Sequence, residues 1–267
     1  MKASFFLDKV RKGKPLVHHL TNWVTIYDCA NIVKVFGAAP VMAHATEEVT
    51  EMTSLSSALV LNIGTLTTDF IEAMKLAVKS ANKKNIPVVL DVCGAGATAF
   101  RDKKVFELLE AGKIDVIKGN ASEVARIAGL DVATKGVDST DVNQDLTEIA
   151  RQLAEKRNCV VVITGAVDIV ADKQKVFKIK NGHAMMANVV GTGCMAASVI
   201  GTFAAISDDL AEGISAGLCC YEIAAECAAE KASGPGTFKE KLFDCIFTLN
   251  SDIVDERQKI LAIFANS

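Results

Sequence analysis

The chain has 267 residues and a formal net charge of −3. This length can hold one large α/β domain or two small ones, with ample material for a hydrophobic core. A charge so close to balance provides neither a basic face for nucleic acid nor a polybasic stretch for an anionic membrane. Half of the residues are hydrophobic but only 6% are aromatic, so the interior must consist mainly of Ala, Val, Ile and Leu. That composition suits parallel strands covered by helices.

Strand-like and helical segments alternate along the first two thirds of the chain. Strands are expected at residues 16–20, 58–64, 86–91, 114–119 and 159–165. Helices are expected between them, at 24–36, at 69–82 and around Phe106, and the first of these ends at Gly37. Strands separated by helices imply right-handed crossovers. The sequence therefore predicts an α/β fold with a central, mostly parallel β-sheet flanked by helices.

The alternation changes after residue 165. Residues 168–171 and 175–179 predict a hairpin that turns at Asp172 and Lys173. Val189 and Val190 predict a short extended segment, and the chain beyond it is mostly helical. No low-complexity linker, internal repeat or shift in composition marks a domain boundary. We therefore predict a single domain over residues 1–267.

Residues 184–206 contain no charged side chain and could be mistaken for a membrane span. They change from a Val-rich start to an Ala-rich end across Asn188 and two Gly-Thr steps, which fits a strand, a glycine turn and a buried helix. The apolar run of residues 5–7 is too short for a signal peptide. We expect a soluble protein with no membrane partner.

The eight cysteines include no C-x-x-C pair and no Cys/His spacing typical of a metal site. Their placement indicates neither a zinc site nor a disulfide framework. The simplest interpretation is a reduced, cytoplasmic protein with mostly structural cysteines.

The run from Val189 to Ser198 is the most informative stretch. Gly191 and Gly193 allow the backbone to turn tightly and to gather N–H groups at the start of a helix, around Thr192 and Cys194. Those N–H groups and the positive end of the helix dipole form an anion site. The alternative is a tight turn into a buried helix, with no ligand.

Polar residues follow each predicted strand within a few positions. They are Thr21 and Asn22, Gly64 and Thr65, Asp91, Asn120 and Glu123, Thr164 and Gly165, and the turn at Gly191. In open α/β sheets, ligands bind beyond the carboxyl ends of the strands. The fold would therefore bring these groups to one rim.

Two carboxylates on this rim are candidate metal ligands. Asp91 precedes the glycine-rich stretch 92–98 and could hold Mg²⁺ through water. Its alternative role is to cap the next helix. Glu123 could likewise complete a capping box with Asn120. Lys118 would add positive charge near any phosphate bound there.

Several other sites are excluded. Gly13 and Lys14 are followed by Pro15, so there is no P-loop, and the protein-kinase motifs and the G-x-S-x-G elbow are missing. His18 and His19 share a strand and must point to opposite faces, so at most one could reach a site.

Taken together, these motifs resemble the hydroxyethylthiazole kinases of thiamine salvage, within the ribokinase-like superfamily. The resemblance spans nearly the whole chain. It is carried by Thr21-Asn22 with Ala30-Asn31, by residues 37–43, by Glu47-Glu48-Val49, by residues 61–66, by residues 119–123, by residues 163–165 and by residues 191–194.

The resemblance implies ATP-dependent phosphorylation of the primary alcohol of 4-methyl-5-(2-hydroxyethyl)thiazole. It also implies Mg²⁺ and a homotrimer with active sites between subunits. Position by position, it implies thiazole contacts at Asn22, Met42 and Gly191, ATP contacts at Lys118, Asn120 and Thr164, metal contacts at Asp91 and Glu123, an anion hole at Gly191, Thr192 and Gly193, and a catalytic Cys194.

The chain departs from the family and superfamily patterns at three places. The family's D-P-V-G motif is replaced by Val92 and Cys93 after Asp91. Lys118 stands where Arg is common, which loses the bidentate fork but keeps the charge. Cys194 stands where the wider superfamily has Asp, although Cys is familiar in thiazole kinases. Its thiol could act as a weak base or merely orient the alcohol.

Two alternatives remain. One is a nucleotide-dependent repair dehydratase for hydrated nicotinamide cofactors, NAD(P)HX, on the same fold, which is expected to keep Asp at position 194. The other is a non-catalytic metabolite-binding protein that has lost its base. ATP consumption that depends on a thiazole alcohol would separate both from a kinase.

Overall fold

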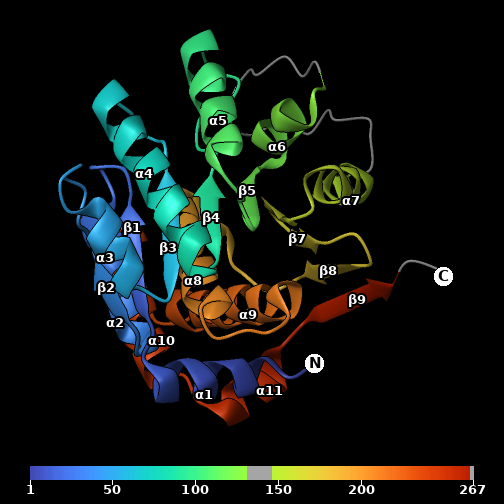
Figure 1. The fold of residues 1–267 in the computed structure, drawn as a ribbon. Helices are drawn as coiled ribbons and strands as arrows, with labels where there is room; N and C mark the ends of the chain where they lie inside the picture. Colours follow the sequence, from blue (N-terminus) through green and yellow to red (C-terminus); the bar gives the residue numbers. More distant parts are fainter. Residues whose placement is uncertain (131–145, 265–267) are drawn as a thin grey trace.

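The computed structural model describes residues 1–130 and 146–264 (Figure 1). Its described part contains a nine-stranded sheet with the order β2-β1-β3-β4-β5-β6-β7-β8-β9. The strands are β1 (Leu16–Leu20), β2 (Ala39–Val41), β3 (Ala58–Asn62), β4 (Val88–Asp91), β5 (Val116–Asn120), β6 (Val160–Thr164), β7 (Asp168–Ala171), β8 (Lys175–Ile179) and β9 (Ile260–Phe264).

The helices cover both faces of the sheet (Figure 1). They are α1 (Ala3–Gly13), α2 (Ile26–Phe36), α3 (Val49–Leu55), α4 (Thr68–Lys84), α5 (Ala99–Ala111), α6 (Ala121–Ala128), α7 (Leu146–Arg157), the 3₁₀ helix η1 (Ala184–Asn188), α8 (Thr192–Ala204), α9 (Leu210–Ala229), α10 (Pro235–Thr248) and α11 (Ser251–Arg257).

The predicted fold class is confirmed. Strands β1 to β6 pair in parallel, and β7, β8 and β9 add antiparallel pairs at one side. The hairpin forms over the predicted residues. Its turn is closed by Asp172, whose Oδ1 accepts hydrogen bonds from the backbone N–H groups of Gln174 at 2.7 Å and Lys175 at 2.8 Å.

Three features differ from the sequence prediction. Strand β2 was not predicted; it has three residues and an edge position that tolerates Pro40. Strand β9 was not predicted either; its side chains are largely exposed and it depends on pairing with β8. The extended segment expected at Val189 and Val190 is limited to Val189, which has an extended backbone but joins no strand. The chain there leaves η1 in a turn, because the Val189 N–H bonds to the Met186 carbonyl at 3.2 Å.

Two hydrophobic cores lie on opposite faces of the sheet. Alternate strand residues such as Val60 and Val89 pack with α1, α2, α8, α9 and α10 in one core. Their neighbours Leu61 and Leu90 pack with α4, α5 and α7 in the other. Strands buried on both faces have to be apolar throughout, which explains their continuous hydrophobic runs.

Helix α8 lies against the middle of the sheet, in contact with β3 and β4. A Cβ atom at Gly201 would overlap the Val60 side chain, so glycine is what permits this close approach. This close packing places the first turn of α8 next to the carboxyl ends of the strands. Residues 184–206 are thus divided between η1 and α8, and no helix in the described ranges is long and apolar enough to cross a membrane.

We expect Gly201→Ala to lower the free energy of unfolding by about 2 kcal/mol, since overpacking a core outweighs the helix propensity gained. The matched control is Gly236→Ala in α10, where an added Cβ meets no atom within 4 Å. Thermal unfolding of both variants measures the difference. Equal stability of the two variants would contradict the packing constraint.

Candidate active site

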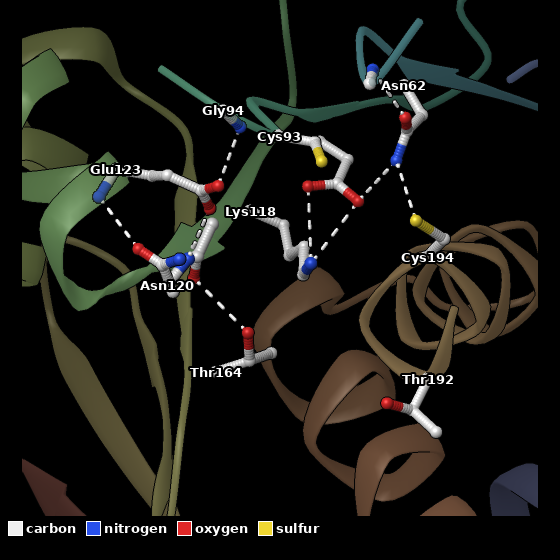
Figure 2. Close-up of polar contacts among 12 residues, drawn as sticks. Asn62, Cys93, Gly94, Lys118, Asn120, Glu123, Thr164, Thr192 and Cys194 are labelled. Carbon is white, nitrogen blue, oxygen red and sulfur yellow. Dashed lines mark hydrogen bonds and ion pairs between the residues drawn. The ribbon is translucent and has the colours of Figure 1, made fainter. Parts of the chain in front are cut away.

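The polar residues predicted to share one rim come together at the carboxyl ends of β1, β3, β4, β5 and β6, facing the first turn of α8 (Figure 2). Strand β1 lies between β2 and β3 in the sheet. The chain therefore leaves β1 toward one side for β2 and returns to the other side for β3. Such a reversal of strand order opens a crevice at the sheet edge, where ligands bind in α/β folds.

A chain of side-chain amides links the rim to Cys194. The amide nitrogen of Asn22 donates to Asn62 Oδ1 at 3.0 Å, and that of Asn62 donates to Asp91 Oδ2 at 2.7 Å. Both amides also donate to the Cys194 sulfur, at 3.2 Å from Asn22 and 3.4 Å from Asn62. Figure 2 shows the second of these contacts. Cys194 thus sits among hydrogen-bond donors.

These surroundings favour the Cys194 thiolate. A hydrogen bond with the Cys93 thiol contributes most to lowering the pKa of Cys194 to about 5, and it outweighs the effect of burial. Hydrogen bonds from Thr25 and Asn22 and the charge of Lys118 act in the same direction. The pKa of Cys93 is raised by the same hydrogen bond and by burial. This hydrogen bond therefore favours the thiolate of Cys194 over that of Cys93.

Lys118 and Asp91 form a buried ion pair. The ammonium nitrogen lies 3.2 and 3.3 Å from the two carboxylate oxygens, and the side chains are 6% and 1% exposed. Burial raises the pKa of Asp91 to about 7, while the Lys118 charge opposes this rise. Burial lowers the pKa of Lys118, but the charges of Asp91 and Glu123 raise it by a larger amount. The ammonium therefore stays protonated.

The Lys118 ammonium also lies beside the glycine turn. A Cβ atom at Gly193 would be 3.5 Å from its nitrogen. Gly191 itself has φ +97°, and a Cβ there would come within 2.7 Å of Thr25. Both the backbone conformation and the space therefore require glycine at residue 191. The first turn of α8 is fixed by Thr192, whose hydroxyl donates to the carbonyls of Met186 and Val189.

Glu123 and Asn120 form the capping box considered as the structural alternative. Asn120 Oδ1 accepts from the Glu123 N–H at 2.9 Å, and Glu123 Oε2 accepts from the Asn120 N–H at 2.8 Å. Glu123 Oε1 accepts from the Gly94 N–H at 2.7 Å, which ties the loop after β4 to the start of α6 (Figure 2). Thr164 pairs in register with Asn120 across β5 and β6. The predicted ATP positions are therefore neighbours.

The residues present fit a water-mediated hold on Mg²⁺. No group of three or more His, Cys, Asp or Glu side chains among the described residues could enclose a metal ion. The oxygens of Asp91 and Glu123 already accept hydrogen bonds, but a carboxylate oxygen has a second lone pair. Mg²⁺ keeps several waters and binds through few carboxylates together with phosphates. Such outer contacts require no rearrangement of the capping box or the ion pair.

An aromatic wall stands next to Asn22. Trp23 stacks on Phe70 with ring centroids 5.6 Å apart, and packs edge-on against His44 at 4.7 Å. Met42 is the first residue after β2, next to β1, and its carbonyl accepts a hydrogen bond from the His44 ring. The predicted substrate positions Asn22 and Met42 therefore lie at the ends of adjacent strands, beside apolar surface.

Several residues of this site were not predicted from the sequence. Asn62 connects Asn22, Asp91 and Cys194, and its presence at the end of an apolar strand was a readable signal. Arg101 donates to the carbonyls of Ile63, Gly64 and Cys93 and so joins the loops after β3 and β4. Its position inside α5 offered no such signal.

The two adjacent histidines take no part in the site. His18 lies within hydrogen-bond distance of the Thr53 hydroxyl and the Ala43 carbonyl, and His19 of the Val17 carbonyl. Burial lowers the pKa of both rings. Both are therefore structural.

Comparison with known proteins agrees with this geometry. The model of the hydroxyethylthiazole kinase family matches residues 7–252. The hydroxyethylthiazole kinases of Methanosarcina mazei and Methanocella arvoryzae are 51% and 48% identical; the alignments cover 95% and 96% of this chain and 97% of each relative. The solved structure of a hydroxyethylthiazole kinase protein from Pyrococcus horikoshii superposes with a TM-score of 0.90 at 38% identity, covering 98% of both chains. The chain therefore belongs to the hydroxyethylthiazole kinase family.

Proposed function

We propose that this chain transfers the γ-phosphoryl group of ATP to the primary alcohol of 4-methyl-5-(2-hydroxyethyl)thiazole, as a kinase of thiamine salvage. The observation that carries the proposal is the Cys194 sulfur, held by the amides of Asn22 and Asn62 at the start of α8. A proton acceptor beside a turn of backbone N–H groups suits attack by an alcohol on a phosphoryl group.

In the proposed reaction, the oxygen of the substrate alcohol attacks the γ-phosphorus of ATP, and ADP leaves. Cys194 accepts the proton that the alcohol loses. The N–H groups of Gly191, Thr192 and Gly193 form the anion hole, and Lys118 adds its charge beside them. Phosphoryl transfer has a loose transition state, so positioning and charge stabilisation supply most of the acceleration.

Substrates and metal are assigned to separate parts of the rim. Asn22, Met42 and Gly191 would contact the thiazole, with the Trp23 ring as an apolar wall nearby. The proposed ATP contacts are Lys118, Asn120 and Thr164. Asp91 and Glu123 would hold Mg²⁺ through water, and the ion supplies charge neutralisation to the phosphates when bound.

We propose a homotrimer with active sites between subunits, as the family resemblance implies, and the surroundings of the site support a subunit interface there. Trp23, Tyr27 and Val190 are 47%, 76% and 75% exposed, and flank the proposed substrate residues Asn22 and Gly191. Exposed apolar side chains gathered at one place mark interaction surfaces. We further propose a single domain over residues 1–267 and a cytoplasmic location, which the eight free cysteines support.

The alternatives make different predictions. The repair dehydratase reading expects Asp at position 194, whereas this chain has Cys194 and belongs to the kinase family. A non-catalytic binding protein would bind ligands without consuming ATP. The decisive measurement is therefore turnover.

We expect ATP to be converted to ADP only when hydroxyethylthiazole is supplied, with pyridoxal and hydroxymethylpyrimidine as poor acceptors. The reason is the apolar wall beside Asn22 together with the glycine turn. A coupled ADP-release assay with these three alcohols tests the substrate. Faster turnover of the pyrimidine or pyridine alcohol would overturn the substrate assignment.

We expect turnover in the order Asp ≥ Cys > Ser ≈ Ala at position 194. Asp provides an ionised acceptor, whereas Ser and Ala cannot replace a thiolate, and general-base assistance is typically worth on the order of 10²-fold or more. The KM for ATP should change little, since the N–H groups of the turn remain. Steady-state kinetics on Cys194→Asp, Cys194→Ser and Cys194→Ala measure the order.

The matched control is Cys227→Ala, a half-buried cysteine on α9 beside Glu230 and Arg257, which should leave turnover unchanged. An Asp variant less active than the Ala variant would show that residue 194 does not accept the proton.

We expect Asp91→Asn to reduce turnover strongly and to raise the Mg²⁺ concentration required for half-maximal rate. It should also lower stability by about 3 kcal/mol, because Lys118 loses its buried counter-charge. The control is Asp102→Asn, which removes another buried carboxylate, bonded to the Gly96 N–H and to Arg126. That variant should lose stability but keep normal activity per folded molecule. If both variants behave alike, Asp91 has only a structural role.

A further inference from the structure

Two buried carboxyl groups face each other behind the proposed ATP positions. Asp168 opens β7 immediately after the turn that follows Thr164, and Glu222 lies on α9. Each residue is only 5% exposed, and the two carboxyl groups are hydrogen-bonded to each other. Ionised carboxylates are acceptors only, so a hydrogen bond between them requires a proton on one of the two.

The remaining contacts leave no other donor for Glu222. Asp168 Oδ1 accepts from the Gly165 N–H at 2.8 Å. Glu222 Oε2 is buried, and no N–H or O–H group within the described ranges donates to it. Gly182 closes that side, since a Cβ there would lie 3.7 Å from Oε2. An ionised Glu222 would therefore bury its Oε2 without a compensating donor.

The negative charges around the pair favour its protonation, and the Lys118 charge opposes it. Burial and the charges of Asp168 and Glu226 raise the pKa of Glu222 well above its usual value. Glu226 lies one turn along α9 and is held by Asn181, by the Gly182 N–H and by Lys259. From β5, the Lys118 charge reaches Asp168, whose pKa is nevertheless raised by burial.

Two further titratable groups stand on α9 next to Glu222. They are Cys219 and Tyr221, and burial raises the pKa of both, so that they stay neutral. The Tyr221 hydroxyl donates to the Thr192 carbonyl at 3.1 Å, in the first turn of α8. No group on α9 therefore supplies a positive charge to the pair.

We propose that Asp168 and Glu222 share one proton and act as a positioning pair, which holds the turn at Gly165 against α9 for ATP binding. The shared proton is inferred from the burial of both carboxyl groups, their mutual contact and the unpartnered Glu222 Oε2, whereas the link to ATP rests on the proposed function. Neither residue is assigned a contact with substrate. Asp168 acts through the Gly165 N–H, and Glu222 acts through Asp168.

The shared proton makes the stability of the fold depend on pH. The folded-state pKa of the pair is above the unfolded value, so its contribution to stability is complete at low pH and is lost as the pH rises through the folded pKa. Above that pH two unshielded carboxylates repel each other across β7 and α9. The KM for ATP should then rise at alkaline pH, while the KM for the thiazole alcohol stays constant.

Infrared difference spectroscopy of the ligand-free protein tests the proton. The carbonyl stretch of a protonated carboxyl group should be present in the parent at mildly alkaline pH, above the pKa of about 7 of Asp91. It should vanish in Asp168→Asn and Glu222→Gln, and persist in the control Glu226→Gln. A parent protein without this band, or a band that survives both amide substitutions, would overturn the shared proton whether or not the protein is a thiazole kinase.

Kinetics test the positioning role. Asp168→Ala should raise the KM for ATP about tenfold, the value of one hydrogen bond to a charged group, and leave the KM for the alcohol unchanged. Asp168→Asn can accept from Gly165 and donate to Glu222, so it should restore the parent KM and remove its alkaline rise. Glu226→Gln removes a charge that raises the pKa of Glu222, so it should keep the parent KM for ATP and move the rise of that KM to lower pH. If Asp168→Ala shifts both KM values equally, or neither, the pair does not position the turn for ATP.

Discussion

The close contact between α8 and the middle of the sheet is the constraint on which the rest of the site depends. Because Gly201 lets the helix lie directly on Val60, the first turn of α8 arrives level with the carboxyl ends of β3 and β4. Only at that height can the amides of Asn22 and Asn62 reach the Cys194 sulfur. A helix held further from the sheet would separate the anion turn from the side chains of the strands.

The sequence was sufficient for the alternation of the buried strands with helices and for the rim, because continuous apolar runs and polar strand ends are local signals. It was insufficient for β9, since nothing in residues 260–264 reveals the β8 edge on which they pair. The contacts of Lys118 could not be predicted from the sequence either. Its charge was expected beside phosphate, but its ion pair with Asp91 depends on the register of two neighbouring strands. Long-range partners are decided by packing and not by spacing along the chain.

The charged groups of the site are held in place before any ligand arrives. Asp91 and Lys118 restrain each other, Glu123 is fixed by two backbone N–H groups, and Arg101 secures the loops after β3 and β4. Buried ion pairs contribute little to stability, because desolvation offsets their attraction. Their retention at this rim is better explained by preorganisation, since fixed dipoles and charges need no rearrangement as charge develops on the phosphoryl group.

The linked amides of Asn22 and Asn62 have a consequence for the chemical direction of the site. Asn22 Oδ1 accepts from the N–H and the hydroxyl of Thr25, so the orientation of its amide is determined, and this in turn determines that of Asn62. Turning either amide over would place oxygen lone pairs against the sulfur, and in Asn62 against the Asp91 carboxylate as well. All hydrogen bonds of the network therefore run in one direction. They start at the Thr25 N–H before α2 and end at the Asp91 carboxylate and the Cys194 sulfur. Cys194 consequently accepts hydrogen bonds from both asparagines. An aspartate in place of either asparagine has nearly the same shape, but its oxygens could only accept, so the sulfur would lose a donor.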